Sequence, residues 1–414
     1  MRLIIKNGLL YDGYADHSAK IAHIVIEQGK VIQVTDIAVE ELPDDEVIDA
    51  LGKWVLPGFL DTHTHYDAEI IASPGLKESA RHGVTTVITG SCSVSAIYNN
   101  AEETSDSFTR VEAIPRHVML PLMETKKTWS TPKEWINYIN KSALGINVAA
   151  FVGHSDLRVK VLGMERSVTD GEKATKEERM KMQTLLQDAL DEGFLGMSTM
   201  DSPWDKMDGD KYWSHKTPSF YASWRERKNL IELLRKEGAI LQGAPNLVTR
   251  ISAGNYMMAS TGVFRKPLKT TMIAMMDLIG DRYILNLTNG LSSLFNKCFK
   301  ADFRMQSPPV PFTVYYDGVD SVMFEEFPSG EALRDLAKNL DLRNDKIRDQ
   351  AFRESFKKEI KNKFAPKVWH KDLSQTTILK CPDKRWIGKN FSEVASIKGV
   401  HPVDAFLDLI VEYD

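Results

Sequence analysis

The stretch with the clearest chemical potential is WVLPGFLDTHTHYD, residues 54–67, where two of only ten histidines in 414 residues stand one residue apart. Alternate side chains of a strand point to the same face, so His63 and His65 would converge on one point. Neutral imidazole is the commonest metal ligand, and two imidazoles on a rigid strand supply half of a zinc-type site. An isolated His-x-His pair is equally explained by two solvated side chains at a strand end.

The surrounding elements favour a metal site. From Leu56 onward, apolar strand-like runs alternate with helical segments, which is the pattern of parallel βαβ units. In a closed barrel of such units, the residues that end the first strand face the mouth, where barrel enzymes carry their sites. Asp61 could orient one imidazole ring as a hydrogen-bond acceptor. The predicted strands are GFLDTHTH (58–65), VTTVITGSC (84–92), GINVAAFVGH (145–154), GFLGMST (193–199), GAILQGA (238–244) and RYILNLTN (282–289).

Helix ends between these strands can also be located. Thr175 with Glu178 and Ser223 with Glu226 have the spacing of a capping box, and a glycine follows each helix. Before the barrel, residues 1–55 give short β-rich runs, which predicts a small β domain followed by a barrel over 56–414. Residues 291–330, with MQSPPVPF in the middle, predict a loop-rich insertion, and the pattern there does not locate a seventh strand.

Composition excludes several classes of protein. With 43% hydrophobic and 27% charged residues, the chain is typical of a globular protein large enough for more than one domain. A net charge of −4 argues against a nucleic-acid partner, because phosphate binding needs clustered Lys and Arg. Three cysteines cannot form a disulfide framework, and neither a leader-like start nor an apolar run of membrane-spanning length is present. We therefore expect a cytoplasmic protein without a membrane partner.

LPGFLDTHTHYD resembles the first-strand signature of the amidohydrolase superfamily. Together with GVTTVITGSCS, FVGHSDLRVKVLG, DEGFLGMST and GVHPVDAFLDLIVE, it is similar in order and spacing to the D-aminoacylase (N-acyl-D-amino-acid deacylase) branch. The resemblance implies an α/β fold: a metal-dependent (β/α) TIM-like barrel with a small N-terminal β-sandwich domain. It also implies zinc held partly by a cysteine that ends the second strand, where Cys92 falls. Without the resemblance, a small buried hydrophobe would be the preferred interpretation of Cys92.

Three further residues are candidate substrate contacts. His154, which ends the third predicted strand, could contact substrate or orient a ligand, or it could cap a turn with Ser155 and Asp156. Arg158 could bind the carboxylate of an acyl amino acid through its two-pronged guanidinium, and a surface salt bridge is the alternative. Ser198 ends the fourth strand, where its hydroxyl could line the pocket.

Three departures from the family pattern bear on function. Histidines that end the family's fifth and sixth strands are matched here by stretches offering Gln242, Asn246, Asn286 and Asn289, and amides are poor zinc ligands. The family's catalytic Asp on the eighth strand has no counterpart before Asp414, so no catalytic base is assigned and the barrel is expected to be incomplete. An open barrel would expose strand edges, which favours association into a homo-oligomer.

Three functions remain open from sequence. The first is a zinc-dependent hydrolase that cleaves N-acyl-D-amino acids to a carboxylate and a D-amino acid, with His63, His65 and Cys92 as ligands. The second is a cyclic amidase of the hydantoinase or dihydropyrimidinase type, although GFLGMST lacks the lysine usual on the fourth strand of those enzymes. The third is an inactive or truncated homologue that keeps the fold.

Overall fold

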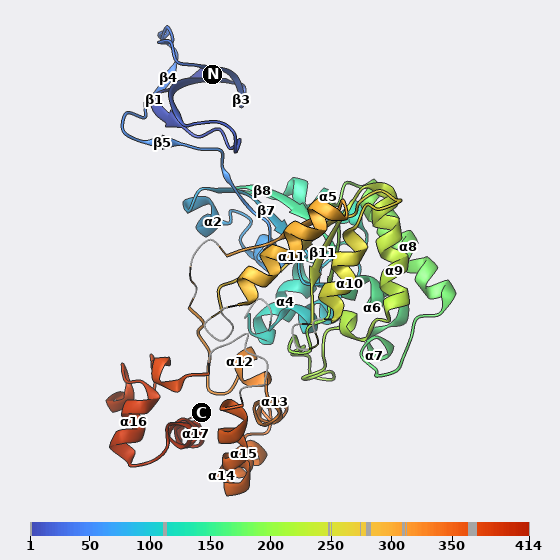
Figure 1. Ribbon diagram of the computed structural model, residues 1–414, viewed down its shortest axis with the longest axis vertical. Coiled ribbons are helices and arrows are strands. Elements are labelled where there is room, and N and C mark those ends of the chain that lie inside the picture. The colour runs from blue at the N-terminus through green and yellow to red at the C-terminus, as the bar shows by residue number, and fades with distance from the viewer. Residues whose placement is uncertain are drawn as a thin grey trace. The chain divides into compact units, whose positions relative to one another are not determined.

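The protein is described by a computed structural model for residues 2–110, 114–246, 249, 251–273, 275–278, 283–308, 311, 313–362 and 371–413. It divides into two compact units, one comprising residues 1–61 and 77–87 and the other residues 62–76 and 88–414. The domain boundary expected between residues 55 and 56 stays a prediction. Figure 1 labels the elements. No helix in the described ranges is long and apolar enough to cross a membrane.

The N-terminal strands form one mixed sheet. β1 (Arg2–Leu10) pairs antiparallel with β2 (Lys20–Glu27), which pairs antiparallel with β3 (Lys30–Thr35). On its other side β1 pairs in parallel with β4 (Glu46–Asp49) and β5 (Trp54–Val55). The small β domain expected from the alternating runs is therefore a five-stranded sheet, and the second layer of a sandwich is not formed within residues 2–61.

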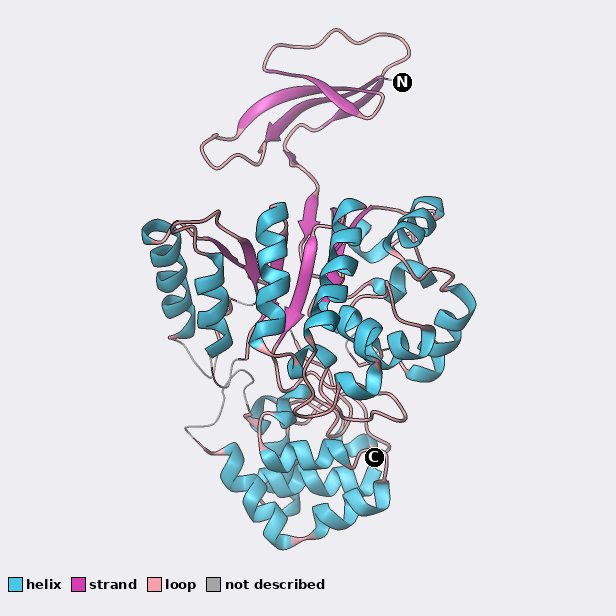
Figure 2. Cartoon of the chain, turned by 90° about the vertical axis from the view of Figure 1, so that its right-hand side faces the viewer, coloured by secondary structure: helices cyan, strands magenta, loops and turns pink. Residues whose placement is uncertain are grey.

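Parallel strands carry the rest of the α/β architecture. In the first unit, β6 (Phe59–Asp61) pairs in parallel with β7 (Val84–Thr89). In the second, five strands pair in parallel in the order β13-β12-β11-β10-β9, and β8 precedes them in the chain. Figure 2 shows helices alongside these strands, as expected for βαβ units. The strands are β8 (Asn147–Ala150), β9 (Val152–Gly153), β10 (Gly196–Met200), β11 (Ile240–Ala244), β12 (Lys269–Met272) and β13 (Asp302–Met305).

The predicted sixth strand at 282–289 is wrong. Residues Ile284–Cys298 form helix α11, and residue 282 lies outside the described ranges. The apparent alternation of ILNLTN is the start of a longer pattern in which Leu287, Leu291 and Leu294 recur at helical spacing. The strands that follow β11 are instead β12 and β13, each four residues long and too short to show a clear period. Part of the stretch 291–330, expected to be rich in loops, is therefore regular structure.

Helix ends follow the predicted signals. Helix α8 (Lys176–Asp191) begins with a complete capping box between Thr175 and Glu178. Helix α9 (Trp224–Glu237) is capped by Ser223 and ends at Gly238, which adopts the left-handed conformation. The remaining early helices are α1 (Asp67–Ala72), α2 (Lys77–Arg81), α3 (Ala101–Phe108), α4 (Arg116–Lys126), α5 (Pro132–Lys141), α6 (His154–Leu162), α7 (Met164–Ser167) and α10 (Ile251–Ser260).

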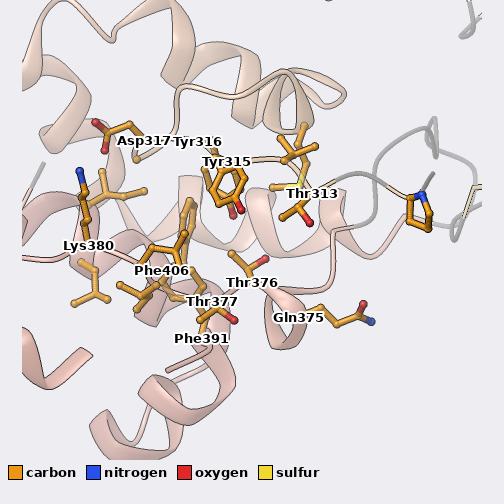
Figure 3. Close-up of a pocket in the computed structure, with 18 of the residues that line it drawn as sticks. Thr313, Tyr315, Tyr316, Asp317, Gln375, Thr376, Thr377, Lys380, Phe391 and Phe406 are labelled. Atoms are coloured by element: carbon orange, nitrogen blue, oxygen red, sulfur yellow. The ribbon is translucent and has the colours of Figure 1, made fainter. Parts of the chain in front are cut away.

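The C-terminal helices pack around a core of their own. Phe324 stacks on Phe406 with ring centroids 5.0 Å apart, and Phe327 packs edge-on against Phe356. Beside this core lies a cavity of about 1510 Å³, into which Phe391 and Phe406 project (Figure 3). Its walls do not include the candidate ligands His63, His65 or Cys92. The helices are α12 (Val322–Glu325), α13 (Pro328–Asp335), α14 (Leu340–Arg348), α15 (Gln350–Ile360), α16 (Phe391–Lys398) and α17 (Pro402–Tyr413).

Candidate metal centre

Three side chains with metal-ligating atoms meet beyond the ends of the first two barrel strands. The candidate ligand atoms of His63, His65 and Cys92 all lie within 4.8 Å of one another. The two imidazole centroids are 5.3 Å apart, and His63 Nε2 lies 3.2 Å from Cys92 Sγ. Among the residues that the structure describes, these three side chains form the cluster of His, Cys, Asp or Glu groups that could hold a metal ion. The three ligands proposed from sequence thus come together.

The histidines are placed by the chain that follows β6. This strand ends at Asp61, so His63 and His65 lie beyond the strand in which they were expected. Thr64 stands between them, and both its amide N and its Oγ1 donate to the Ile88 carbonyl of β7, at 3.1 and 2.8 Å. Thr64 is only 4% exposed. The segment therefore stays extended beside β7, and alternation directs the two imidazoles to the side opposite Thr64.

The His63 ring is oriented by Gln306, which follows β13. His63 Nδ1 lies 2.8 Å from Gln306 Oε1, an atom that can only accept, so Nδ1 carries the proton. His63 Nε2 is then the unprotonated nitrogen, and it faces the Cys92 thiol. Hydrogen bonding of the second ring nitrogen is the usual way in which a metal-binding histidine is held in the correct tautomer. Gln306 thus orients the His63 ring so that Nε2 is its candidate metal-binding atom.

The electrostatics of the cluster favour neutral groups when no ion is bound. Burial and the neighbouring His63 lower the pKa of His65 to about 3, so its imidazole is neutral at pH 7. Burial, with a contribution from Asp205, raises the pKa of the Cys92 thiol well above its usual value. A protonated Cys92 can donate to His63 Nε2, and a metal ion would take the place of that proton.

Cys92 lies in a strained loop after β7. Gly90, Cys92 and Ser93 have φ of 72°, 51° and 71°, all in the left-handed region. This conformation costs a residue other than glycine on the order of 1–3 kcal/mol, and it persists only where the surroundings enforce it. Cys92 N donates to Gln242 Oε1 at 3.2 Å, and Ser93 N donates to Ser198 Oγ at 3.0 Å. Side chains from β11 and β10 therefore support the left-handed turn.

Two buried carboxylates hold the same loop. Asp67 accepts hydrogen bonds from Gly90 N at 3.2 Å and from Ala96 N at 3.4 Å. Asp156 accepts from the backbone amides of residues 97–99. Burial raises the pKa of Asp67 to about 7, against the effect of its hydrogen bonds, and burial also raises the pKa of Asp156. Both carboxylates are occupied by the loop.

His154 and Arg158, the predicted substrate contacts, are 0% exposed. His154 begins α6, and its Nε2 lies 2.9 Å from Glu226 Oε1 while its Nδ1 lies 3.0 Å from Thr199 Oγ1. Arg158 Nη1 donates to Glu226 Oε2 at 2.5 Å, and its other N–H groups donate to backbone carbonyls. The surface salt bridge considered for Arg158 is wrong because the side chain is fully buried. Contact of either residue with substrate stays a prediction.

Glu226 is the centre of this buried network. Burial lowers the pKa of His154, so the imidazole is neutral and donates its Nε2 proton to Glu226. Burial of Glu226 would raise its own pKa, but the hydrogen bonds from His154 and Arg158 and the positive charge of Arg158 outweigh that effect and lower the pKa to about 2. Arg158 and Glu226 are therefore a buried ion pair with its hydrogen bonds satisfied.

Ser198 also faces inward. It is 0% exposed, and its Oγ donates to the Gly90 carbonyl at 2.5 Å while it accepts from Ser93 N. Met200, at the end of the same strand, packs against Cys92. Ser198 thus supports the loop of Cys92, and a contact between Ser198 and substrate stays a prediction.

Sequence reasoning missed three residues of the site. Gln306 follows β13, whose four residues, DFRM, are too few to be recognised as a strand from sequence. Asp67 stands two residues after His65, and Asp156 was considered only as a partner in a turn. The sequence carries no signal for either carboxylate, because burial and hydrogen bonds to the distant backbone amides of the Cys92 loop become visible only in the folded chain.

The donor set fits a zinc-type ion. Two imidazoles and one sulfur are ligands that zinc prefers, and three protein ligands leave a position open for water or substrate. His65 Nδ1 is buried and has no hydrogen-bond partner among the residues that the structure describes. A buried polar atom without a partner is costly, and a bound ion is one way to satisfy it. The side-chain amide of Gln306 contacts His63, and that of Gln242 contacts the backbone of Cys92.

Comparison with known proteins places these features in a family context. Residues 46–212 match the amidohydrolase family. An uncharacterised protein of Mycobacterium tuberculosis (strain ATCC 25618 / H37Rv) is 44% identical over 413 residues, which are 99% of this chain and 67% of that protein. N-acyl-D-aspartate deacylase of Alcaligenes xylosoxydans xylosoxydans is 31% identical over 196 residues, 47% of this chain and 36% of that enzyme.

A solved structure extends the likeness to the fold. The crystal structure of N-acyl-D-glutamate deacylase from Bordetella bronchiseptica, complexed with zinc and a phosphonate inhibitor that mimics the tetrahedral intermediate, aligns with a TM-score of 0.58. The alignment covers 98% of this chain and 69% of that chain, at 18% sequence identity. At this identity the likeness is one of fold.

Proposed function

Because the chain belongs to the amidohydrolase family, we propose that it is a zinc-dependent hydrolase that cleaves the amide bond of N-acyl-D-amino acids. The observation that carries the proposal is the meeting of His63, His65 and Cys92 within 4.8 Å. The class of substrate is inferred from the names of the related deacylases, and the metal is inferred from the donor set and from the zinc in one structural neighbour.

Each ligand residue has a distinct part in the proposed site. His63 would bind through Nε2, because Nδ1 is held by Gln306, and Cys92 would bind as a thiolate. His65 would bind as a neutral imidazole. A zinc ion held there would supply Lewis-acid polarisation of the acyl carbonyl and would lower the pKa of a bound water. The strained loop fixes Cys92 before the ion arrives, which reduces the reorganisation that binding requires.

No proton acceptor is assigned within the described part of the chain. Amide hydrolysis needs a group that takes a proton from water and passes it to the leaving amine. Asp67 and Asp156 are the buried carboxylates that hold the Cys92 loop, and their oxygens already accept backbone hydrogen bonds. We therefore give these two residues a supporting role in the proposed enzyme.

The reaction is tested by amino-acid release from N-acetyl-D-aspartate and N-acetyl-D-methionine, with their L-forms and hydantoin as comparators, in the presence of zinc. We expect hydrolysis of a D-form and loss of about two or more orders of magnitude in kcat/KM for His65→Ala. Preference for hydantoin would favour the cyclic-amidase alternative. A zinc-loaded protein that hydrolyses none of these compounds would support an inactive homologue.

A further inference from the structure

The loop from Gly90 to Asn99 must be held from two sides for Cys92 to face His63. Its first half is held by Gln242 and Ser198, which bond to the amides of Cys92 and Ser93. Left-handed residues other than glycine relax when their supports are removed. The second half of the loop, residues 95–99, has an anchor of its own.

That anchor is Asp156, in the first turn of α6. Its Oδ2 accepts from Ser95 Oγ at 2.7 Å and from Ile97 N at 3.0 Å. Tyr98 N donates to both carboxylate oxygens, at 3.1 and 3.2 Å, and Asn99 N donates to Oδ1 at 3.1 Å. Each of these partners is a donor, so both carboxylate oxygens act as acceptors and together hold residues 95 and 97–99.

The anchored half of the loop is tightly coupled to the half with Cys92. Ser95 Oγ, while donating to Asp156, accepts from Gly153 N at 2.9 Å. A Cβ at Gly153 would lie 2.3 Å from the Ser93 carbonyl oxygen, so β9 and the loop are in backbone contact. Because this region is closely packed, a shift of residues 95–99 would also displace Ser93 and Cys92.

We propose that Asp156 is a positioning residue of the metal centre, whose carboxylate fixes residues 95–99 and so keeps Cys92 in the conformation that faces His63. This inference rests on the proposed metal site, since it concerns the geometry of one of its ligands. It assigns to the Asp of the GHSDLR motif a role that does not require contact with substrate or with the ion.

Titration of the metal-free protein with cobalt(II) tests the proposal without measuring catalysis. Cobalt bound to a thiolate gives a charge-transfer absorption that cobalt bound by histidines alone does not give. We expect the band in the wild-type protein and a loss of about 10–100-fold in cobalt affinity for Asp156→Asn, with a weakened band at saturation. The matched control is Glu226→Gln, which removes another buried carboxylate whose partners are His154 and Arg158.

The outcomes separate the two claims. If the wild-type protein shows no thiolate band, the proposed metal site is wrong. A wild-type band that persists at full intensity and affinity in Asp156→Asn would overturn the positioning role alone, as would equal losses in Asp156→Asn and Glu226→Gln at matched folded fraction. Should Asp156→Asn not fold, Ser95→Ala removes one donor to the same carboxylate, and an unchanged band in that variant would also refute the proposal.

Discussion

Two glutamine amides hold the candidate ligands at the scale of single residues. Gln242 accepts from Cys92 N, and Gln306 accepts from His63 Nδ1. Both side-chain amides donate from Nε2 to the Thr62 carbonyl, each at 3.4 Å. Gln242 within β11 and Gln306 just after β13 therefore converge on the same peptide group. Although an amide binds zinc poorly, it orients a better ligand well, because its NH2 group donates hydrogen bonds while its carbonyl oxygen accepts them.

Gln306→Leu should weaken metal binding without removing a ligand. The change removes the Gln306 acceptor of His63 Nδ1, which weakens the control of ring orientation and tautomer, and we expect about 10–100-fold lower zinc affinity. Competition with a chromophoric chelator measures the affinity. Gln187→Leu is the matched control, because that side chain bonds to Asp191 on the surface of α8. Equal affinity in Gln306→Leu and the wild-type protein would contradict this role.

Glu226→Gln should destabilise the protein by about 3–5 kcal/mol at pH 7, because it leaves the fully buried Arg158 without its counter-ion. The pKa of Glu226 is lowered from 4.5 to about 2 in the folded state. Its stabilisation is therefore present above pH 4.5 and lost as the pH falls towards 2. Urea unfolding should show a constant difference from the wild-type protein between pH 7 and about 5, and a smaller one at about pH 3.5.

The control for this prediction is Glu232→Gln, on the same helix, where the carboxylate is 45% exposed and pairs with Arg235 and Arg265. Surface pairs contribute about 0–1 kcal/mol. A loss in Glu226→Gln no larger than that in Glu232→Gln would show that the buried pair has little net effect.

At the scale of elements, close backbone contact at β9 is the main constraint on the Cys92 loop. Gly153→Ala would place a Cβ 2.3 Å from the Ser93 carbonyl oxygen, and backbone cannot move aside as a flexible side chain can. We expect a loss of about 1–3 kcal/mol in unfolding free energy, measured by urea denaturation. In Gly243→Ala on β11 the new Cβ would meet Tyr256 at 3.5 Å, an ordinary contact, so the two alanine variants should differ clearly.

Elements with a long, regular signal could be predicted, and short ones could not. Helices α8 and α9 and strands β10 and β11 carry caps or apolar runs, so their positions follow from sequence. Strands β12 and β13 are four residues each, and their identity depends on pairing with neighbours far away in the chain. The error at 282–289 arose because six residues of alternation cannot be told from the start of a helix.

The same limit applied to the site. His63, His65 and Cys92 could be proposed because their residue types and the family resemblance point to metal binding. The supporting residues Gln306 and Asp156 could not be proposed in this way. Gln306 contacts a histidine that lies 243 residues away in the chain, and the Asp156 carboxylate accepts hydrogen bonds from backbone amides 57–59 residues away. The burial of Arg158 could not be predicted from sequence either, because charged side chains are mostly exposed in folded proteins.

At the scale of the whole molecule, the C-terminal helices are joined to the loop that follows β10 through buried charges. Arg334 of α13 is 0% exposed and pairs with Asp208, and Arg110 pairs with Glu325 of α12. Lys206, 3% exposed, pairs with Glu331 at 2.9 Å. The pairs of Asp208 and Lys206 connect α13 to the segment that follows Met200, which itself packs on Cys92. Arg110, which follows α3, connects α12 to the same segment by donating to the Trp204 carbonyl at 3.1 Å. The helical region is thus linked to the candidate metal centre indirectly, through the residues that follow β10.

The central claim is that His63, His65 and Cys92 hold a metal ion together. The most direct test is zinc content per chain, measured by plasma mass spectrometry on the purified protein and on the variant His63→Ala, His65→Ala, Cys92→Ala. We predict about one zinc per wild-type chain and almost none in the folded variant. Zinc absent from both proteins after purification and reloading, or retained in the variant, would contradict the claim.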